Sequence, residues 1–121
     1  MNEKKRHTGE RTIRRALRTY VRRKQFLVHS TVSGTLAREL DVDSTELHEY
    51  LMRKYGCDAA AWRTGLRVEQ AKKLLLEEPR AFLREVAARC GFSDRSNFSR
   101  QFLSHTGLTP AEWRERHCCN E

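Results

Sequence analysis

The chain is strongly basic and has 121 residues, enough for one domain or two very small subdomains. It carries 24 Lys and Arg against 16 Asp and Glu, a formal net charge of +8. Residues 1–30 hold ten of the basic residues and only two acids, so the whole excess lies near the N-terminus. The charge has two interpretations, a polyanionic partner or a solvated helix face. The sequence has no apolar run of membrane-spanning length and no secretion signal, so we expect a cytoplasmic chain with free thiols.

The N-terminal segments are the most basic part of the chain. Residues 1–10 are polar and predict a flexible basic tail. Over residues 11–28, apolar side chains such as Ile13, Leu17 and Tyr20 recur at i, i+3 and i+4 spacing, which predicts an amphipathic helix. Such a helix could rest on an anionic membrane. Its first three turns lack Trp and Phe, which favours packing on the rest of the domain.

Two helices joined by a tight turn follow in the first half of the chain. Residues 33–40 predict a short helix, and residues 41–42 predict a turn. Asp43 is a good N-cap for a helix that runs to Tyr55, and Glu46 stands three residues after the cap, as in a capping box.

The pattern then continues through a longer helix into a second short helix and turn. Residues 58–77 predict the longer helix, with Asp58 as its cap and Pro79 beyond its end. Residues 82–90 predict the short helix, and the turn follows at residues 91–92.

The C-terminal segment predicts two more capped helices. Ser93 is the expected N-cap of the first, with Phe98 and Phe102 on its core side and Gly107 at its end. Thr109–Glu112 has the pattern of a capping box with proline at the first helical position, which opens the last helix. The sequence contains no alternating apolar and polar run of strand length. We therefore expect an all-α fold of about seven helices.

The chain also matches itself at a spacing of 50 to 51 residues. Each copy has a short helix, a tight turn, a capped longer helix, a glycine and another capped helix. The first two helices of each copy form a helix-turn-helix. The matched pairs are Leu36 with Val86, Ala37 with Ala87, Val42 with Phe92, Asp43 with Ser93, Leu47 with Phe98, Leu51 with Phe102, Gly56 with Gly107, and Trp62 with Trp113.

The second copy resembles the DNA-binding domain of AraC/XylS-type transcriptional regulators. The resemblance lies in residues 85–102, in Gly107-Leu108-Thr109-Pro110 and in Trp113-Arg114. Residues 66–75 are similar to the linker helix of that family. The resemblance implies a first helix-turn-helix unit at about residues 11–57, a linker helix at about 58–77 and a second unit at about 80–117. The two units would enter adjacent major grooves about 34 Å apart.

The resemblance also indicates how the chain would act. Its layout is similar to that of the small stand-alone family members, so it implies a nucleoid-associated monomer that binds double-stranded DNA and activates transcription. The alternative is a protein-interaction module of the same fold that binds another regulator or RNA polymerase.

The second recognition helix has side chains suited to base contacts. With Phe98 and Phe102 inward, its outward side carries Arg95, Ser96, Asn97, Ser99 and Arg100. Arginine can pair with guanine in a bidentate manner, asparagine can pair with adenine, and serine hydroxyls suit phosphates or base edges. We therefore expect base contacts from these residues.

The first recognition helix is less suited to DNA because it carries several acids. Its outward side would be Ser44, Thr45, His48, Glu49 and Met52. Glu49 can accept a hydrogen bond from cytosine N4, but an acid near phosphates lowers affinity. The first unit could therefore contact bases, bind weakly or stay outside the groove.

The arginines of the first helix are candidates for backbone contacts. Arg14, Arg18 and Arg22 lie on its polar side and are expected to contact phosphates. Alternatively, they face a protein partner such as an acidic patch on RNA polymerase.

Other chemistry is poorly supported. His117, Cys118 and Cys119 could ligate a metal, but their spacing is not that of a known site and a fourth ligand is not evident. Cys57 and Cys90 are expected to be packing residues. The sequence lacks the patterns of a catalytic triad, phosphate loop or metalloprotease, so we expect no cofactor, no metal and no enzymatic activity.

Overall fold

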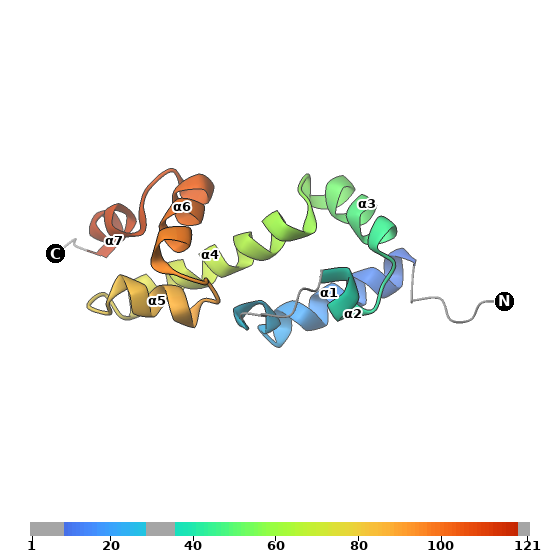
Figure 1. Cartoon of the computed structure of the whole chain (residues 1–121), viewed down its shortest axis with the longest axis horizontal. Helices are drawn as coiled ribbons and strands as arrows, with labels where there is room; N and C mark the ends of the chain where they lie inside the picture. The colour runs from blue at the N-terminus through green and yellow to red at the C-terminus, as the bar shows by residue number, and fades with distance from the viewer. Residues whose placement is uncertain (1–8, 29–35, 119–121) are drawn as a thin grey trace. The chain divides into compact units, whose positions relative to one another are not determined.

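A computed structural model describes residues 9–28 and 36–118, and within these ranges the chain folds into seven α-helices with no strand (Figure 1). The predicted all-α fold of about seven helices is thus confirmed, whereas the predicted tail at residues 1–8 lies outside the described residues. The helices are α1 (Glu10–Arg22), α2 (Leu36–Leu40), α3 (Ser44–Tyr55), α4 (Ala59–Glu77), α5 (Leu83–Arg89), α6 (Arg95–Thr106) and α7 (Pro110–Cys118), with a short 3-10 helix at Gln25–Leu27.

The chain divides into two compact units, each built around a helix-turn-helix. The first contains α1, α2, α3 and the start of α4 as far as Arg63. The second contains α4 from Thr64 onward and α5 to α7, together with Phe26–Val28. The helix-turn-helix of the first unit is α2–α3, and that of the second is α5–α6. Helix α4 runs without interruption from one unit into the other.

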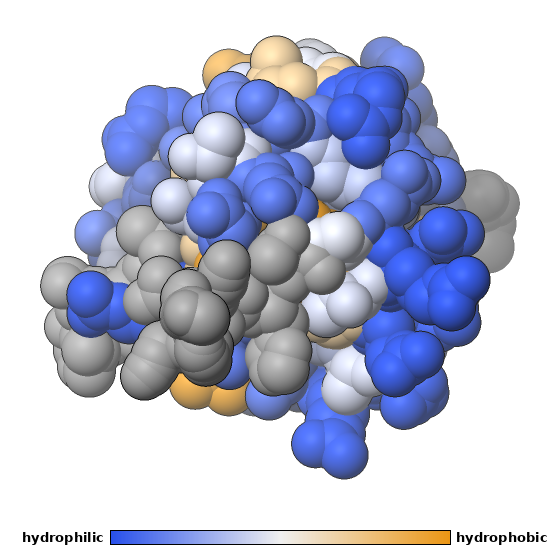
Figure 2. Space-filling model, turned by 90° about the vertical axis from the view of Figure 1, so that its right-hand side faces the viewer, coloured by the Kyte–Doolittle hydropathy of each residue, from blue (hydrophilic) through white to orange (hydrophobic). Residues whose placement is uncertain are grey.

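Polar residues cover much of the described surface, and the face drawn in Figure 2 is predominantly hydrophilic. Across residues 9–28 and 36–118, no helix is both long enough and apolar enough to cross a bilayer. The apolar residues instead gather in a core within each unit.

Helix α1 supplies one wall of the first core. Ile13, Leu17 and Tyr20 are buried, which confirms the predicted amphipathic helix. It ends at Arg22, and Lys24 adopts a left-handed backbone with φ 53° that α-helical hydrogen bonding cannot continue through.

The start of α3 is held by side-chain hydrogen bonds. The Asp43 carboxylate accepts the N–H groups of Thr45 and Glu46 at 2.9 and 3.1 Å, as its predicted cap role requires. Glu46 Oε1 accepts the Gly9 N–H at 3.0 Å, so this carboxylate ties the start of α1 to α3. The predicted start of the preceding helix at residue 33 lies outside the described residues.

The core of the second unit is a row of aromatic rings. The ring centroids of Phe92 and Phe98 are 5.0 Å apart, those of Phe98 and Phe102 5.7 Å, and those of Phe102 and Trp113 6.0 Å. Phe98 and Phe102 are fully buried, as predicted. Tilted and edge-on pairs at these distances stabilise a core beyond simple area burial.

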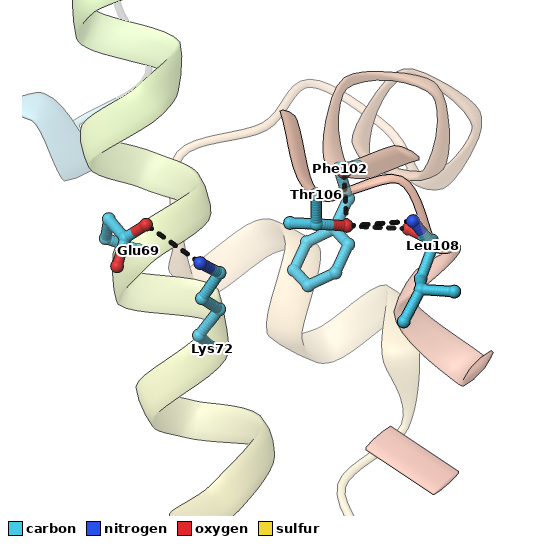
Figure 3. A network of polar contacts seen from close by, with 5 residues as sticks. All are labelled: Glu69, Lys72, Phe102, Thr106 and Leu108. Carbon is cyan, nitrogen blue, oxygen red and sulfur yellow. Dashed lines mark hydrogen bonds and ion pairs between the residues drawn. The ribbon is translucent and has the colours of Figure 1, made fainter. Parts of the chain in front are cut away.

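Figure 3 shows two separate sets of polar contacts, one at the end of α6 and one on α4. The Thr106 hydroxyl lies 2.9 Å from the Phe102 carbonyl oxygen and accepts the Leu108 N–H at 3.1 Å. On α4, Lys72 donates to Glu69 at 3.0 Å. The Leu108 bond satisfies a backbone N–H just beyond the end of α6, whereas the bond between Lys72 and Glu69 joins two side chains.

The last helix begins at a reciprocal capping box, as predicted. The Glu112 N–H donates to Thr109 Oγ1 at 3.1 Å, and the Thr109 N–H donates to Glu112 Oε1 at 2.9 Å. The cap predicted for α6 was wrong by one residue. The Asp94 carboxylate, and not Ser93, accepts the Asn97 N–H at 2.7 Å.

The internal repeat holds at the level of single hydrogen bonds. The Val42 N–H donates to the Ala37 carbonyl at 3.0 Å, and the Phe92 N–H donates to the Ala87 carbonyl at the same distance. The two turns are therefore equivalent at a spacing of 50. The caps Asp43 and Asp94 are 51 apart, which identifies Ser93 as the added residue of the second copy.

The turn of the second unit requires glycine for two reasons. Gly91 has φ +89°, and a Cβ there would lie 2.9 Å from the Leu27 carbonyl oxygen and 3.0 Å from that of Phe26. Arg67 holds this segment in place, donating from Nε to the Phe26 carbonyl and from Nη2 to the Val28 carbonyl. Only glycine combines this backbone conformation with so close an approach.

Candidate nucleic-acid interface

Helix α6 presents one polar side, and its opposite side is fixed in the core. Arg95, Ser96 and Arg100 are exposed, and Asn97 and Ser99 are partly exposed. The Asp94 cap makes Arg95 the first helical residue, so this side chain lies at the N-terminal end of the helix. The structure therefore places all five predicted contact residues on the accessible side of a single helix.

Two of these side chains interact with each other. Arg100 Nη2 donates to Asn97 Oδ1 at 3.1 Å. Because the two residues are three apart on a helix, the bond orients the guanidinium along the exposed side. The Asn97 amide nitrogen and the remaining Arg100 N–H groups stay free of this bond and can donate to acceptors on a ligand.

Arg95 belongs to a cluster of four arginines. Arg80, Arg84, Arg95 and Arg114 line a hollow of about 360 Å³ together with Ala81, Phe82 and Leu83. Arg114 Nη1 donates to the Ala81 carbonyl at 2.6 Å, and Arg84 Cζ lies 5.1 Å from the centre of the Phe82 ring. Four cations around one hollow create a positive potential that suits a phosphate.

Sequence reasoning missed three members of this cluster. Arg80 and Arg84 flank the start of α5, and Arg114 lies on α7. The only signal available was the pair of arginines in the segment Pro79–Arg84, since the approach of α7 depends on tertiary packing.

The exposed side of α3 carries the predicted residues and fewer free acids than the sequence suggests. Ser44, Thr45, His48 and Glu49 are all exposed, and Met52 is 45% exposed. Asp43 and Glu46, the other two acids at the start of this helix, accept hydrogen bonds from backbone N–H groups. Glu49 is thus the one acid on the proposed contact side of α3.

The α1 arginines border an open hollow in the first unit. Arg14, Arg18 and Arg22 are exposed and line a space of about 450 Å³. The same space is lined by Leu17, Val21, Tyr50, Lys54, Tyr55 and Trp62. Sequence reasoning found the arginines but missed the aromatic floor, because its residues come from three helices.

The environment of Trp62 differs from the one that the repeat predicts. The repeat predicts equivalent environments for Trp62 and Trp113, but Trp62 is half-buried whereas Trp113 is only 8% exposed. The Trp62 ring lies 5.9 Å from that of Tyr20 and 6.3 Å from that of Tyr55. The open hollow exposes the Trp62 indole, whereas the His117 ring stacks on Trp113 at 4.2 Å.

The cysteines do not form a site in the described part of the chain. Cys90 is fully buried, and burial raises the pKa of its thiol to about 11, so the thiol is protonated and suits packing. No group of three potential metal ligands occurs within the residues that the structure describes. Cys119 and the side chain of Cys118 lie outside them.

Two helix-turn-helix units, each with an exposed polar side on its second helix, define a helix-turn-helix protein. A family described as "Helix-turn-helix domain" matches residues 36–116. The chain is 36% identical over 70 residues to the HTH-type transcriptional activator RhaR of Cronobacter sakazakii, covering 58% of this chain and 24% of that protein. It is 32% identical over 81 residues to the arabinose operon regulatory protein of Escherichia coli, covering 67% and 27%.

The fold matches as well. The C-terminal domain of AraT, a response regulator from Geobacillus stearothermophilus, superposes with a TM-score of 0.75 at 27% identity, covering 91% of this chain and 88% of that one. The chain belongs to the AraC/XylS-type helix-turn-helix family of transcriptional regulators. It spans about a quarter of the length of the curated relatives it matches.

Proposed function

We propose that this chain is the sequence-specific DNA-binding part of a transcriptional activator and that α6 is its main recognition helix. The observation that carries the proposal is the accessible side of α6, where Arg100 and Asn97 lie opposite the buried Phe98 and Phe102. In helix-turn-helix proteins, the N-terminal turns of the second helix contact base edges in the major groove.

Within α6, the two arginines have different surroundings and are assigned different tasks. Arg100, held by Asn97, would donate to guanine O6 and N7, which specifies a base. Arg95, within the arginine cluster, would bind phosphate together with Arg80, Arg84 and Arg114. Phosphate contacts position the protein and carry little sequence information.

Helix α3 is proposed to enter the adjacent major groove, about 34 Å away on the same face of the DNA. Ser44, Thr45 and His48 would contact phosphates or bases there. Glu49 would accept from a cytosine N4 or else repel the backbone. Changing Glu49 to Ala should therefore tighten non-specific binding, unless a cytosine contact is lost.

The remaining expectations complete the proposal. The chain would act as a monomer without cofactor, metal or catalysis. Phosphate contacts by Arg14, Arg18 and Arg22 remain a prediction, and the alternative is that these arginines face a protein partner such as RNA polymerase. Changing these three arginines to Ala should reduce the slope of log K against log [salt] by about 0.9 for each lost phosphate contact.

The proposal is tested by selecting bound sequences from a randomised duplex pool. We expect an enriched motif with two conserved blocks about one helical turn apart. Enrichment of one block would limit base recognition to a single unit. A pool without enrichment, with weak binding at all salt concentrations, would instead favour the protein-interaction module of the same fold.

A further inference from the structure

The hollow in the first unit has a lining unlike that of the arginine cluster in the second. We call it the first-unit hollow and define it by Arg14, Leu17, Arg18, Val21, Arg22, Tyr50, Lys54, Tyr55 and Trp62. Its residues come from α1, from the last turns of α3 and from the start of α4. All of them belong to the same compact unit, so the hollow is formed by one body.

The floor of the hollow is apolar and open. Tyr55 is 51% exposed, Trp62 and Val21 are half-buried, and Leu17 and Tyr50 close the bottom. Exposed aromatic side chains that share one depression are typical of surfaces that bind a partner. Tyr and Trp in particular contribute strongly to protein interfaces.

The rim of the hollow is cationic. Arg14, Arg18, Arg22 and Lys54 lie around the floor, and no acidic side chain is among the lining residues. Within the described residues, none of the four forms a salt bridge. An apolar floor within a ring of unpaired cations complements a ligand that combines an apolar anchor with several carboxylates.

The position of the hollow separates it from the proposed DNA contact side. Successive residues of a helix are rotated by about 100°, which places Tyr50 and Lys54 about 180° from the centre of the side formed by Thr45, His48 and Met52. Tyr55, at the C-terminal end of α3, lies about 50° from that centre. A duplex bound along that side of α3 would leave Tyr50 and Lys54 on the opposite side of the helix. Only this separation rests on the proposed function. The floor and the rim are independent of it.

We propose that the first-unit hollow is a docking site for an acidic segment of a partner protein, with an apolar side chain of that segment packed on the Tyr55 and Trp62 rings. The carboxylates of the segment would pair with the four rim cations. A phosphate backbone offers no apolar group to cover the two aromatic rings. A second copy of this chain would bring two cationic rims together, and a small anion would stay largely exposed in so open a depression.

The test uses the full chain and two labelled probes. The first is a short helical peptide with a leucine–phenylalanine pair on one side and acidic residues flanking that pair. The second has the same acids but alanine at both apolar positions. We expect the first peptide to bind about tenfold more tightly than the second, because only the first fills the floor.

Matched variants locate the site. R18E should weaken binding of the first peptide about tenfold, and Y55S about fivefold. R15E removes an exposed arginine of the same helix that does not line the hollow, and it should change binding by no more than about twofold. All three side chains are exposed, so the fold should persist, which circular dichroism can verify.

Three results would overturn the proposal. Equal losses from R18E and R15E would show that only net charge matters. Equal affinity for the two peptides would show that the aromatic floor is not used. A larger loss of duplex binding from R18E than from R15E, with peptide binding unchanged, would assign the rim to DNA phosphates. The peptide measurements do not depend on the duplex selection described above, so they test the docking site even if that selection enriches no sequence.

Discussion

The two helix-turn-helix units share a backbone but differ in what they enclose. Where the second unit has Phe92, Phe98 and Phe102, the first has Val42, Leu47 and Leu51 at the equivalent buried positions. The first unit instead has three aromatic rings, those of Tyr50, Tyr55 and Trp62, around an open hollow, whereas the second encloses its row of four rings. The turn hydrogen bonds and caps are common to both units, whereas the side chains around them differ and give each unit its own surface and core.

The same contrast applies to the two turns. Asp41 and Gly91 occupy equivalent positions with φ of 59° and 89°. Asp is among the few side chains that adopt this region at moderate cost. At Gly91 the neighbouring carbonyl oxygens leave no room for a Cβ, so the turn of the second copy accepts only glycine.

The largest expected effect concerns the two tryptophans. Trp113→Ala should lower the free energy of unfolding by about 3–5 kcal/mol, because the indole is almost fully buried against Phe102. Trp62→Ala should cost markedly less, since its indole already faces the hollow. Chemical denaturation of both variants checks this, and equal losses would contradict the contrast between closed and open units.

The turn positions should differ by a smaller amount. Gly91→Ala should lower the free energy of unfolding by about 2–3 kcal/mol, through both the backbone conformation and the overlap with carbonyl oxygens. Asp41→Gly at the equivalent position should change it by less than about 1 kcal/mol. Thermal melts of the two variants suffice, and a harmless Gly91→Ala would refute the close approach.

The caps predict a still smaller difference. Asp94→Ala and Asp43→Ala should each cost about 1 kcal/mol, because each carboxylate accepts backbone N–H groups at a helix start. Ser93→Ala should be nearly neutral, since Ser93 is exposed and lies outside the cap. If Ser93→Ala lowered the free energy of unfolding and Asp94→Ala did not, Ser93 would be the N-cap of α6, as the sequence predicted.

The smallest effect concerns an ion pair of the second unit. Arg89 donates two hydrogen bonds to Glu78, at 2.9 and 3.0 Å, and these bonds hold the pKa of that carboxyl below its ordinary value of 4.5. A lowered pKa contributes stability that is present above the ordinary value and is lost as the pH falls through the folded-state value. The stability difference between wild type and Glu78→Gln should therefore be small, be greatest at neutral pH and vanish in acid. A difference that grows in acid would contradict the pairing.

Local features of this fold could be predicted from the sequence. The Asp43 cap, the Thr109–Glu112 capping box and the burial of Phe98 and Phe102 depend on neighbours within a few residues. The register error at Ser93 arose because the repeat changes spacing there, and serine and aspartate are both good caps.

Features that depend on tertiary packing could not be predicted. The approach of Arg114 to Arg95 and the contact of Gly91 with the Phe26–Val28 segment join residues far apart in the chain. The same holds for the bond between Glu46 and Gly9, which engages one of the carboxylates that the sequence places on α3. Sequence spacing alone carries no signal for these contacts.

The central claim is that α6 specifies bases through Arg100, whereas Arg95 binds phosphate. Binding of Arg100→Ala, Arg95→Ala and the exposed control Lys73→Ala is measured on the selected duplex and on each of its single-base variants. We expect Arg100→Ala to lose about 1–3 kcal/mol of binding free energy and to relax preference at one base pair. Arg95→Ala should weaken all sequences alike, and Lys73→Ala should have little effect. An Arg100→Ala variant with wild-type affinity and wild-type base preference would contradict the account.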